Sequence, residues 1–155
     1  MTGVKTEGDT QPAEAACARL ITAHCYAIDH NDAETFVGAF TADGEWRRPG
    51  GEALHGHEAL RAYFLARPPT ISRHVCTNVV VTVTGADDAV GTSLATLYRS
   101  RATGAEGPAP LGGPLGIVEY TDDLVRTADG WRIRRRHSEL VFAAGATGSP
   151  TGDHR

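Results

Sequence analysis

The stretch from Ile71 to Val83 reads ISRHVCTNVVVTV and is rich in β-branched residues, which favour a strand. In a strand, successive side chains point to opposite faces. Alternation therefore predicts one face with His74, Cys76, Asn78, Val80 and Thr82, and an apolar face with Val75, Val79, Val81 and Val83. A histidine and an asparagine among small groups are typical of the wall of a polar-lined pocket, although the solvent side of a sheet has the same pattern.

Further strands follow this one. The chain turns at residues 85–88 into a predicted strand over 89–101, and two more span 115–127 and 131–142. The last two are joined by Ala128-Asp129-Gly130, which is typical of a hairpin turn. Strands joined by reversals form an antiparallel meander, and one face of such a sheet must be covered.

The residues before the meander predict three helices. They span 12–28, a short segment that begins near Asn31, and 56–66. Asn31 is placed to cap the second helix, with Glu34 three residues further on. Residues 45–54 between the second and third helices read as a hairpin. The pattern predicts an α+β fold in which a curved antiparallel sheet wraps around N-terminal helices.

Composition limits the classes of partner. The chain has 155 residues, of which 41% are hydrophobic, so it fits one domain with a sizeable core. Its net charge is -4, and its one basic run, residues 132–136, has the alternation of a strand whose arginines mostly face outward. We therefore expect no nucleic-acid partner.

Residues 1–12 do not resemble a signal peptide, and no apolar stretch approaches the roughly 18 residues that a spanning helix needs. Cys17, Cys25 and Cys76 form no CxxC pair and are typical of small core residues in a reducing compartment. We expect a cytoplasmic protein without a membrane partner. Its predicted organisation is a flexible tail over 1–12, a domain over 13–142 and a second flexible tail over 143–155.

Six motifs, in this order, are similar to those of a known family. They are Tyr26-Ala27-Ile28-Asp29-His30-Asn31-Asp32, Phe40-Thr41-Ala42-Asp43-Gly44-Glu45-Trp46, Gly56-His57-Glu58-Ala59-Leu60, Arg73-His74-Val75-Cys76-Thr77-Asn78, Tyr120-Thr121-Asp122 and Asp129-Gly130-Trp131-Arg132-Ile133. On these motifs, residues 13–142 resemble the SnoaL-like branch of the nuclear transport factor 2-like superfamily.

The resemblance implies a cone, in which a bent sheet closes over the helices and leaves one deep pocket. It also implies a dimer formed through the outer sheet face. The superfamily includes polyketide cyclases, steroid delta-isomerases, scytalone and bile-acid dehydratases, limonene epoxide hydrolases and non-catalytic dioxygenase beta subunits. Because these members share one fold, the fold does not settle the reaction.

Two residues match site positions of the dehydratase members, in which a histidine early in the strand after the third helix pairs with an aspartate at the end of the first helix. His74 and Asp29 match this pair. The dehydratases also place a carbonyl-polarising tyrosine before the aspartate, and this chain has His24 there. A neutral imidazole donates a hydrogen bond but is a different acid, so the substrate class does not transfer. His24 also lies on the apolar stripe of its helix, where a hydrogen-bonded core histidine is equally expected.

Further polar residues are predicted on inward-facing strand positions. Asp122 shares a face with Tyr120, and alternation places Arg135 inward with Trp131 and Ile133. An inward carboxylate and arginine predict a buried ion pair that fixes the sheet. At the pocket, Asp122 would instead orient His74, and Tyr120 would donate a hydrogen bond to substrate. The candidate substrate-binding residues are Asn78, Tyr120, Asp122, Trp46 and Tyr63.

We expect no metal and no cofactor. His55 and His57 form a pair, but no second pair has ligand spacing. The sequence contains no P-loop, no GxGxxG that opens a helix and no GxSxG elbow.

The sequence predicts a cofactor-independent lyase or isomerase of the dehydratase or cyclase type, acting on a small, largely apolar carbonyl compound of the polyketide or terpenoid kind. His74 would move a proton next to the carbonyl, Asp29 would orient His74, and His24 or Asn78 would hold the carbonyl oxygen. A non-catalytic module that binds a small ligand or a partner is the alternative. Epoxide hydrolysis is a third, although its Asp-Arg-Asp arrangement is not recognisable by spacing. We also expect a homodimer that buries an outer sheet face carrying Val79, Val81 or their neighbours beside arginines.

Overall fold

A computed structural model of the protein describes residues 7–101 and 106–145. The elements in chain order are α1 (Glu7–Asp29), α2 (Ala33–Gly38), β1 (Phe40–Arg47), β2 (Leu54–His55), α3 (Gly56–Leu65), β3 (Ile71–Val83), β4 (Asp88–Ser100), β5 (Gly116–Thr127) and β6 (Gly130–Ala143). No helix in this part of the chain is long and apolar enough to cross a membrane.

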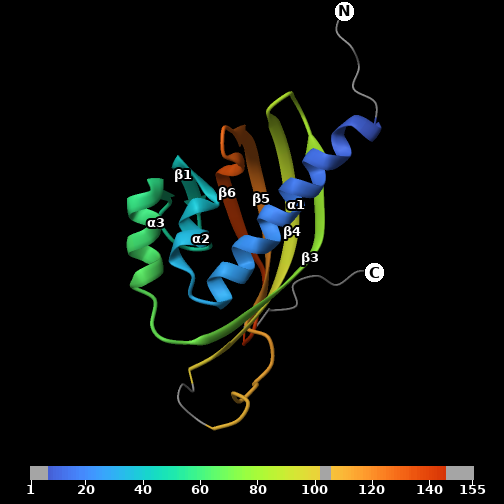
Figure 1. Ribbon diagram of the computed structural model, residues 1–155. Helices are drawn as coiled ribbons and strands as arrows, with labels where there is room; N and C mark the ends of the chain where they lie inside the picture. Colours follow the sequence, from blue (N-terminus) through green and yellow to red (C-terminus); the bar gives the residue numbers. More distant parts are fainter. Residues whose placement is uncertain (1–6, 102–105, 146–155) are drawn as a thin grey trace, which may run out of the picture.

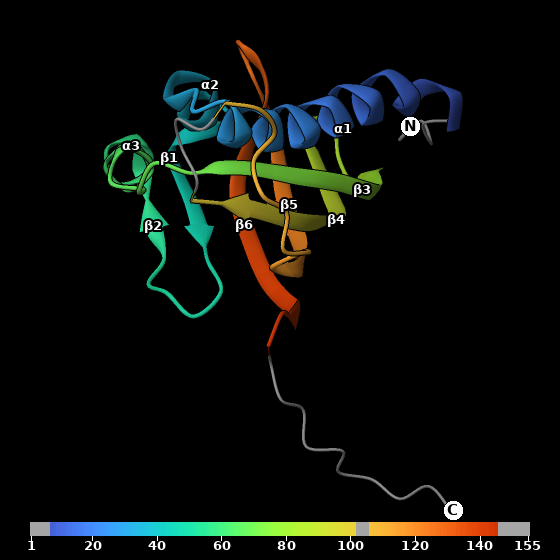
Figure 2. The same ribbon diagram turned by 90° about the horizontal axis from the view of Figure 1, so that it is seen from below.

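The strands form one sheet in the order β2-β1-β6-β5-β4-β3. Strands β3 to β6 form the predicted antiparallel meander, and β1 pairs with β6 in parallel. Helix α1 crosses one face of this curved sheet, while α2 and α3 lie beside β1 (Figures 1 and 2). The predicted α+β fold is therefore confirmed.

The apolar stripe of α1 explains its position. Cys17, Ile21 and Cys25 are buried against the sheet. The helix approaches β4 closely at Gly91, where an added Cβ would lie 2.8 Å from Cδ1 of Ile21. A glycine in the strand makes this close contact possible.

Several predicted element limits differ from the structure. Helix α1 begins at Glu7 and contains Pro12, so residues 7–12 are helical, whereas residues 1–6 lie outside the described residues. Pro12 has no backbone N–H, so the second turn of the helix has one hydrogen bond fewer. At the other end, β6 includes Ala143, and residues 146–155 of the predicted tail lie outside the described residues.

The N-cap of α2 also lies one residue later than predicted. Asp32 is the N-cap, and its side chain accepts a hydrogen bond from the backbone N–H of Thr35 at 3.0 Å. Asn31 instead has a φ of 55° in the turn after α1. Asparagine tolerates this left-handed conformation better than most residues, which explains why it precedes the cap.

Strand β3 changes its facing at a β-bulge. Asn78 has a φ of 52°, and the pairing with β4 shifts between Thr77 and Val80. Ser72, His74 and Cys76 point to the helix side before the bulge, and Val79, Val81 and Val83 do so after it. The prediction that Asn78 shares the inner face with His74 was wrong, as was the outer placement of Val79 and Val81, because a bulge inserts one extra residue.

Strand β6 contains a similar irregularity. Asp123 pairs with Arg135 but Leu124 pairs with Ile133, so Arg134 is the extra residue. Beyond this point Arg136 and Ser138 are buried, and Arg135 faces outward. The inward arginine is therefore Arg136 rather than Arg135.

Candidate active site

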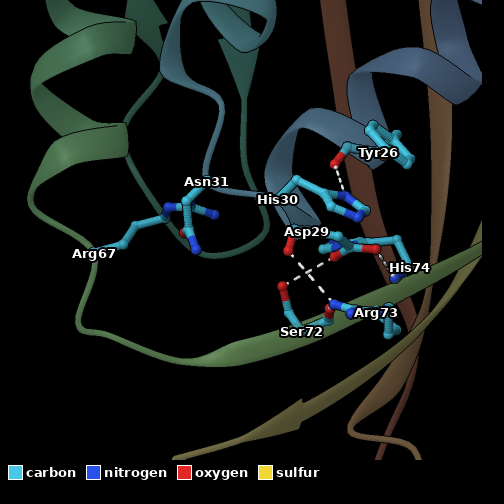
Figure 3. A network of polar contacts seen from close by, with 8 residues as sticks. All are labelled: Tyr26, Asp29, His30, Asn31, Arg67, Ser72, Arg73 and His74. Carbon is cyan, nitrogen blue, oxygen red and sulfur yellow. Dashed lines mark hydrogen bonds and ion pairs between the residues drawn. The ribbon is translucent and has the colours of Figure 1, made fainter. Parts of the chain in front are cut away.

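The C-terminal end of α1 meets the start of β3 at Asp29 and His74 (Figure 3). The ring N–H at Nδ1 of His74 donates to Oδ1 of Asp29 at 2.7 Å, and the backbone N–H of His74 donates to Oδ2 at 2.6 Å. The hydroxyl of Ser72 donates to Oδ1 of Asp29 at 2.9 Å. The carboxylate therefore binds the histidine at two points, and the predicted pairing of Asp29 with His74 is present.

The environment of Asp29 keeps it ionised. Burial alone would raise the pKa of Asp29, but the hydrogen bonds from His74 and Ser72 outweigh it and hold the pKa below the ordinary value. Its side chain is 6% exposed and that of His74 is 8% exposed. An acceptor at Nδ1 fixes the tautomer that carries its proton there, so the lone pair of His74 is on Nε2.

His74 lines a cavity of about 260 Å³. Its walls are mainly apolar, with Ile28, Phe36, Phe64, Leu97, Val118 and Leu140 among the lining residues. The volume lies just below the roughly 300–1,000 Å³ typical of small-molecule sites. The cavity therefore fits a compact ligand with a largely apolar body.

Three of the predicted substrate-binding residues reach this cavity: Trp46, Tyr63 and Tyr120. The indole N–H of Trp46 donates to the hydroxyl of Ser138 at 2.8 Å, which fixes the ring. Burial raises the pKa of Tyr120 above its ordinary value, so its hydroxyl keeps its proton at neutral pH. Tyr120 is thus able to donate a hydrogen bond to an oxygen in the cavity.

His24 lies in the core and does not line this cavity. Its ring packs against those of Phe36, Phe40 and Trp46, and its Nδ1 accepts a hydrogen bond from Arg136 at 2.7 Å. Burial, together with the charge of Arg136, holds the pKa of His24 well below its ordinary value. The structure thus gives His24 the role of a hydrogen-bonded core residue rather than that of a group facing this cavity.

Asp122 and Arg136 form the buried ion pair that the sequence predicted for a carboxylate and an arginine. Nε and Nη2 of Arg136 donate to Oδ1 and Oδ2 of Asp122, each at 2.7 Å, and both side chains are fully buried. The guanidinium carbon lies 4.5 Å from the centre of the Tyr120 ring. Asp122 itself does not line the cavity, so the pair supports Tyr120 from behind.

The remaining candidates lie elsewhere. Asn78 is exposed at the β3 bulge and does not line the cavity. The ring N–H at Nε2 of His57 donates to the carbonyl of Phe40 at 3.0 Å, and His55 lies beside Glu45 on the surface. Within residues 7–101 and 106–145, no three His, Cys, Asp or Glu side chains are grouped so that they could hold a metal ion.

The sequence interpretation missed the cations of the cavity. Arg48, Arg67 and Arg99 all line it. A signal was present for Arg99, because strand alternation from the buried Ala95 leads through Leu97 to Arg99 on the same side. For Arg48 and Arg67, which follow β1 and α3, no periodic pattern indicates a direction.

The profile of the SnoaL-like domain matches residues 9–137. The chain belongs to the SnoaL-like domain family. Among solved structures it is similar to Rv3472 from Mycobacterium tuberculosis, a protein of unknown function, with 30% identity, a TM-score of 0.72 and coverage of 89% of this chain and 78% of that one.

Two further members of the nuclear transport factor 2-like superfamily have the same fold. A proposed dehydratase from Streptomyces avermitilis shares 25% identity at a TM-score of 0.71, over 84% of this chain and 97% of that one. A proposed scytalone dehydratase from Novosphingobium aromaticivorans shares 19% identity at a TM-score of 0.72, over 96% and 99%. No curated protein matches the chain.

Proposed function

We propose that this SnoaL-like protein is a lyase or isomerase that acts without a cofactor, by general acid-base catalysis, on a small carbonyl compound. The observation that supports this proposal is the Asp29–His74 pair, at 2.7 Å, at the wall of a largely apolar cavity. Similarity to a proposed dehydratase at 25% identity agrees with this class of reaction.

The proposed reaction begins with proton transfer to His74. The lone pair on Nε2 removes a proton from the carbon next to the carbonyl, and the electrons of that C–H bond move onto the carbonyl oxygen. Asp29 places a negative charge beside the imidazolium that forms, and the Tyr120 hydroxyl donates to the developing oxyanion. The imidazolium then returns its proton, either to another carbon in an isomerisation or to a departing hydroxide in a dehydration.

Epoxide hydrolysis is a weaker candidate. That reaction uses an arginine between two aspartates. In the buried core of this protein, Arg136 binds one aspartate, Asp122. A further N–H of that guanidinium donates to His24, a neutral acceptor. This network also lies behind the cavity rather than along it.

Deuterium exchange tests the proposal before the natural substrate is known. The ketone 2-tetralone has exchangeable protons next to its carbonyl, and their loss in D₂O is followed by proton NMR. We expect the wild-type protein to accelerate this exchange. His74→Ala should lower the acceleration by roughly two to four orders of magnitude, and Asp29→Asn, which keeps the shape and loses the charge, should lower it less.

His30→Ala is the matched control, because His30 is exposed and its Nδ1 bonds to the backbone carbonyl of Tyr26. It should exchange the ketone at the wild-type rate. A His74→Ala protein that folds normally and exchanges at the wild-type rate would contradict the mechanism. A wild-type protein that binds the ketone without accelerating exchange would instead support the non-catalytic binding module.

A further inference from the structure

We propose that Arg67 and Arg99 form an anion-binding subsite at the cavity, and that the ligand is a largely apolar compound bearing a carboxylate. This inference rests on the proposed function, because it defines the class of substrate that the same cavity receives. It arises from the cations in the cavity wall, which the acid-base mechanism does not use.

The two arginines come from separate parts of the chain and meet at one place. Arg67 follows α3, and Arg99 lies near the end of β4. Both line the cavity that contains His74, and both line a neighbouring hollow of about 270 Å³, to which Tyr63 also contributes. They therefore lie between two hollows, where a ligand in the cavity can reach them.

Arg67 is held by neutral groups. Its Nε donates to the carbonyl of Phe64 at 3.1 Å, and its Nη2 donates to Oδ1 of Asn31 at 3.3 Å. The guanidinium carbon lies 3.8 Å from the centre of the Phe64 ring. Burial, together with the charge of Arg99, lowers the pKa of Arg67. These contacts fix the position of the cation without neutralising its charge.

Arg99 completes the pair. Among residues 7–101 and 106–145, its side chain makes no hydrogen bond or ion pair. The nearby carboxylate of Asp29 also acts on Arg67, but it is already bound by His74 and Ser72. Two like charges near each other are unfavourable, and an anion between them relieves this repulsion.

Other arginines of the chain show the contrast. Arg61, Arg134, Arg135 and Arg136 each form an ion pair with a carboxylate. Arg48, the third arginine of the cavity, resembles Arg67: it stacks over Tyr63 at 4.4 Å and donates to the carbonyl of Glu52 at 3.3 Å. Its Nε is buried without a hydrogen-bond partner among the described residues. All three arginines of the cavity wall thus lack a carboxylate partner among the described residues, a feature that they share with Arg73, Arg126 and Arg132 outside the cavity.

This arrangement gives the ligand a direction. A carboxylate bound between Arg67 and Arg99 would form charge-assisted hydrogen bonds, while the apolar body packs against residues such as Phe64 and Leu97. One end of the ligand is then fixed by charge, and the other extends along the wall that carries His74. Such anchoring places a reacting carbon beside a base more often than apolar packing alone.

Two nearly isosteric probes test the subsite. The anion 2-naphthoate and the neutral ketone 2-acetonaphthone differ in one group, and calorimetric titration gives the affinity of each. We expect the wild-type protein to bind 2-naphthoate about tenfold more tightly, and added salt to reduce that preference. Arg99→Gln should abolish most of the preference and leave the affinity for 2-acetonaphthone unchanged.

Arg134→Gln is the matched control, because it removes the same charge from a surface pair with Asp88, away from the cavity. It should keep the preference. Arg67→Lys retains the charge and should keep part of it, whereas Arg67→Gln should lose it. Arg99→Gln breaks no side-chain hydrogen bond or ion pair among the described residues, so the test remains valid if the Arg67 variants fail to fold.

Binding is also measured in His74→Ala, which should retain the preference for 2-naphthoate, since the subsite does not require the base. Equal affinity of the wild-type protein for the two probes would overturn the anion subsite and leave the acid-base proposal standing. A preserved preference in Arg99→Gln and Arg67→Gln would overturn the assignment to these residues. Failure of both probes to bind would contradict the subsite together with the ligand cavity.

Discussion

The buried ring of His24 makes a hydrogen bond that exists only while the ring is neutral. Its Nδ1 accepts a hydrogen bond from the guanidinium of Arg136, which is possible only for a neutral ring. Burial and the charge of Arg136 both oppose a proton on the ring, and they hold its pKa well below the ordinary value. The folded protein therefore keeps His24 neutral at a pH where the unfolded chain protonates it.

The sign of the pH dependence follows. Because the folded pKa of His24 is the lower one, its neutral contact contributes fully above the unfolded value of about 6.5 and is lost progressively as the pH falls below it. The slope of the unfolding free energy against pH then approaches about 1.4 kcal/mol per pH unit.

We expect the unfolding free energy of the wild-type protein to fall more steeply between pH 7.5 and 5.5 than that of His24→Asn. Urea unfolding measures both slopes. His30→Asn, at an exposed site, should keep the wild-type slope, and identical slopes for wild type and His24→Asn would contradict this account.

The Asp122–Arg136 pair leads to a prediction of stability. Both side chains are fully buried, so Asp122→Asn leaves an uncompensated charge in the core and should lower the unfolding free energy by about 3–5 kcal/mol. The control is Asp88→Asn, since Asp88 pairs with Arg134 on the surface and both side chains are about half exposed. Its loss should be below about 1 kcal/mol. Chemical denaturation at pH 7 compares the two variants, and equal losses would show that the buried pair has no special role.

At the level of elements, the sequence predicted the strands but not the faces of two of them. Period-two alternation is correct along β4 and β5, where it places Tyr120 and Asp122 inward. In β3 and β6 a bulge inserts one residue, and the side chains that follow it, such as Val79 and Arg136, change face. The pair Asp29–His74 was predicted because a family motif fixes where α1 ends and β3 begins. The contact between Arg136 and His24 and the positions of Arg48 and Arg67 depend on distant segments and are contained in no local pattern, whereas alternation along β4 does indicate Arg99.

At the β3 bulge, Asn78 matters for the backbone conformation that it adopts and not for contacts of its side chain with a ligand. Its φ of 52° is accessible to asparagine and glycine but strained for a β-branched side chain. Asn78→Val should therefore lower the unfolding free energy by about 1–2 kcal/mol, and Asn78→Gly should have little effect. Since Asn78 is exposed outside the cavity, Asn78→Gly should bind 2-naphthoate like the wild type. Weaker binding of 2-naphthoate by a normally folded Asn78→Gly protein would show that Asn78 contributes to ligand binding.

At the scale of the whole molecule, the sheet has one covered and one open face. The buried core lies between the sheet and the helices, and α1 crosses only that side of the sheet (Figure 2). The outer face carries Val75, Val80 and Val90, which are 49%, 61% and 37% exposed. The sequence predicted Val79 and Val81 on this face, but the bulge turns those two inward. Exposed apolar side chains that gather on one sheet face are typical of an interface.

We propose that a second copy of the chain covers this outer face in a homodimer. Static light scattering at micromolar concentration should then give twice the chain mass of 16.4 kDa. Val75→Glu combined with Val80→Glu places four like charges in a two-fold interface, because each residue appears once in each copy, and should shift the protein to the monomer. Leu65→Glu is the control: Leu65 is 68% exposed at the end of α3, away from the outer face, and its variant should remain dimeric. A monomeric wild-type protein would contradict the interface. A dimer that survives the double substitution would place the contact on another surface, since no two-fold interface centred on these valines could bury four uncompensated carboxylates.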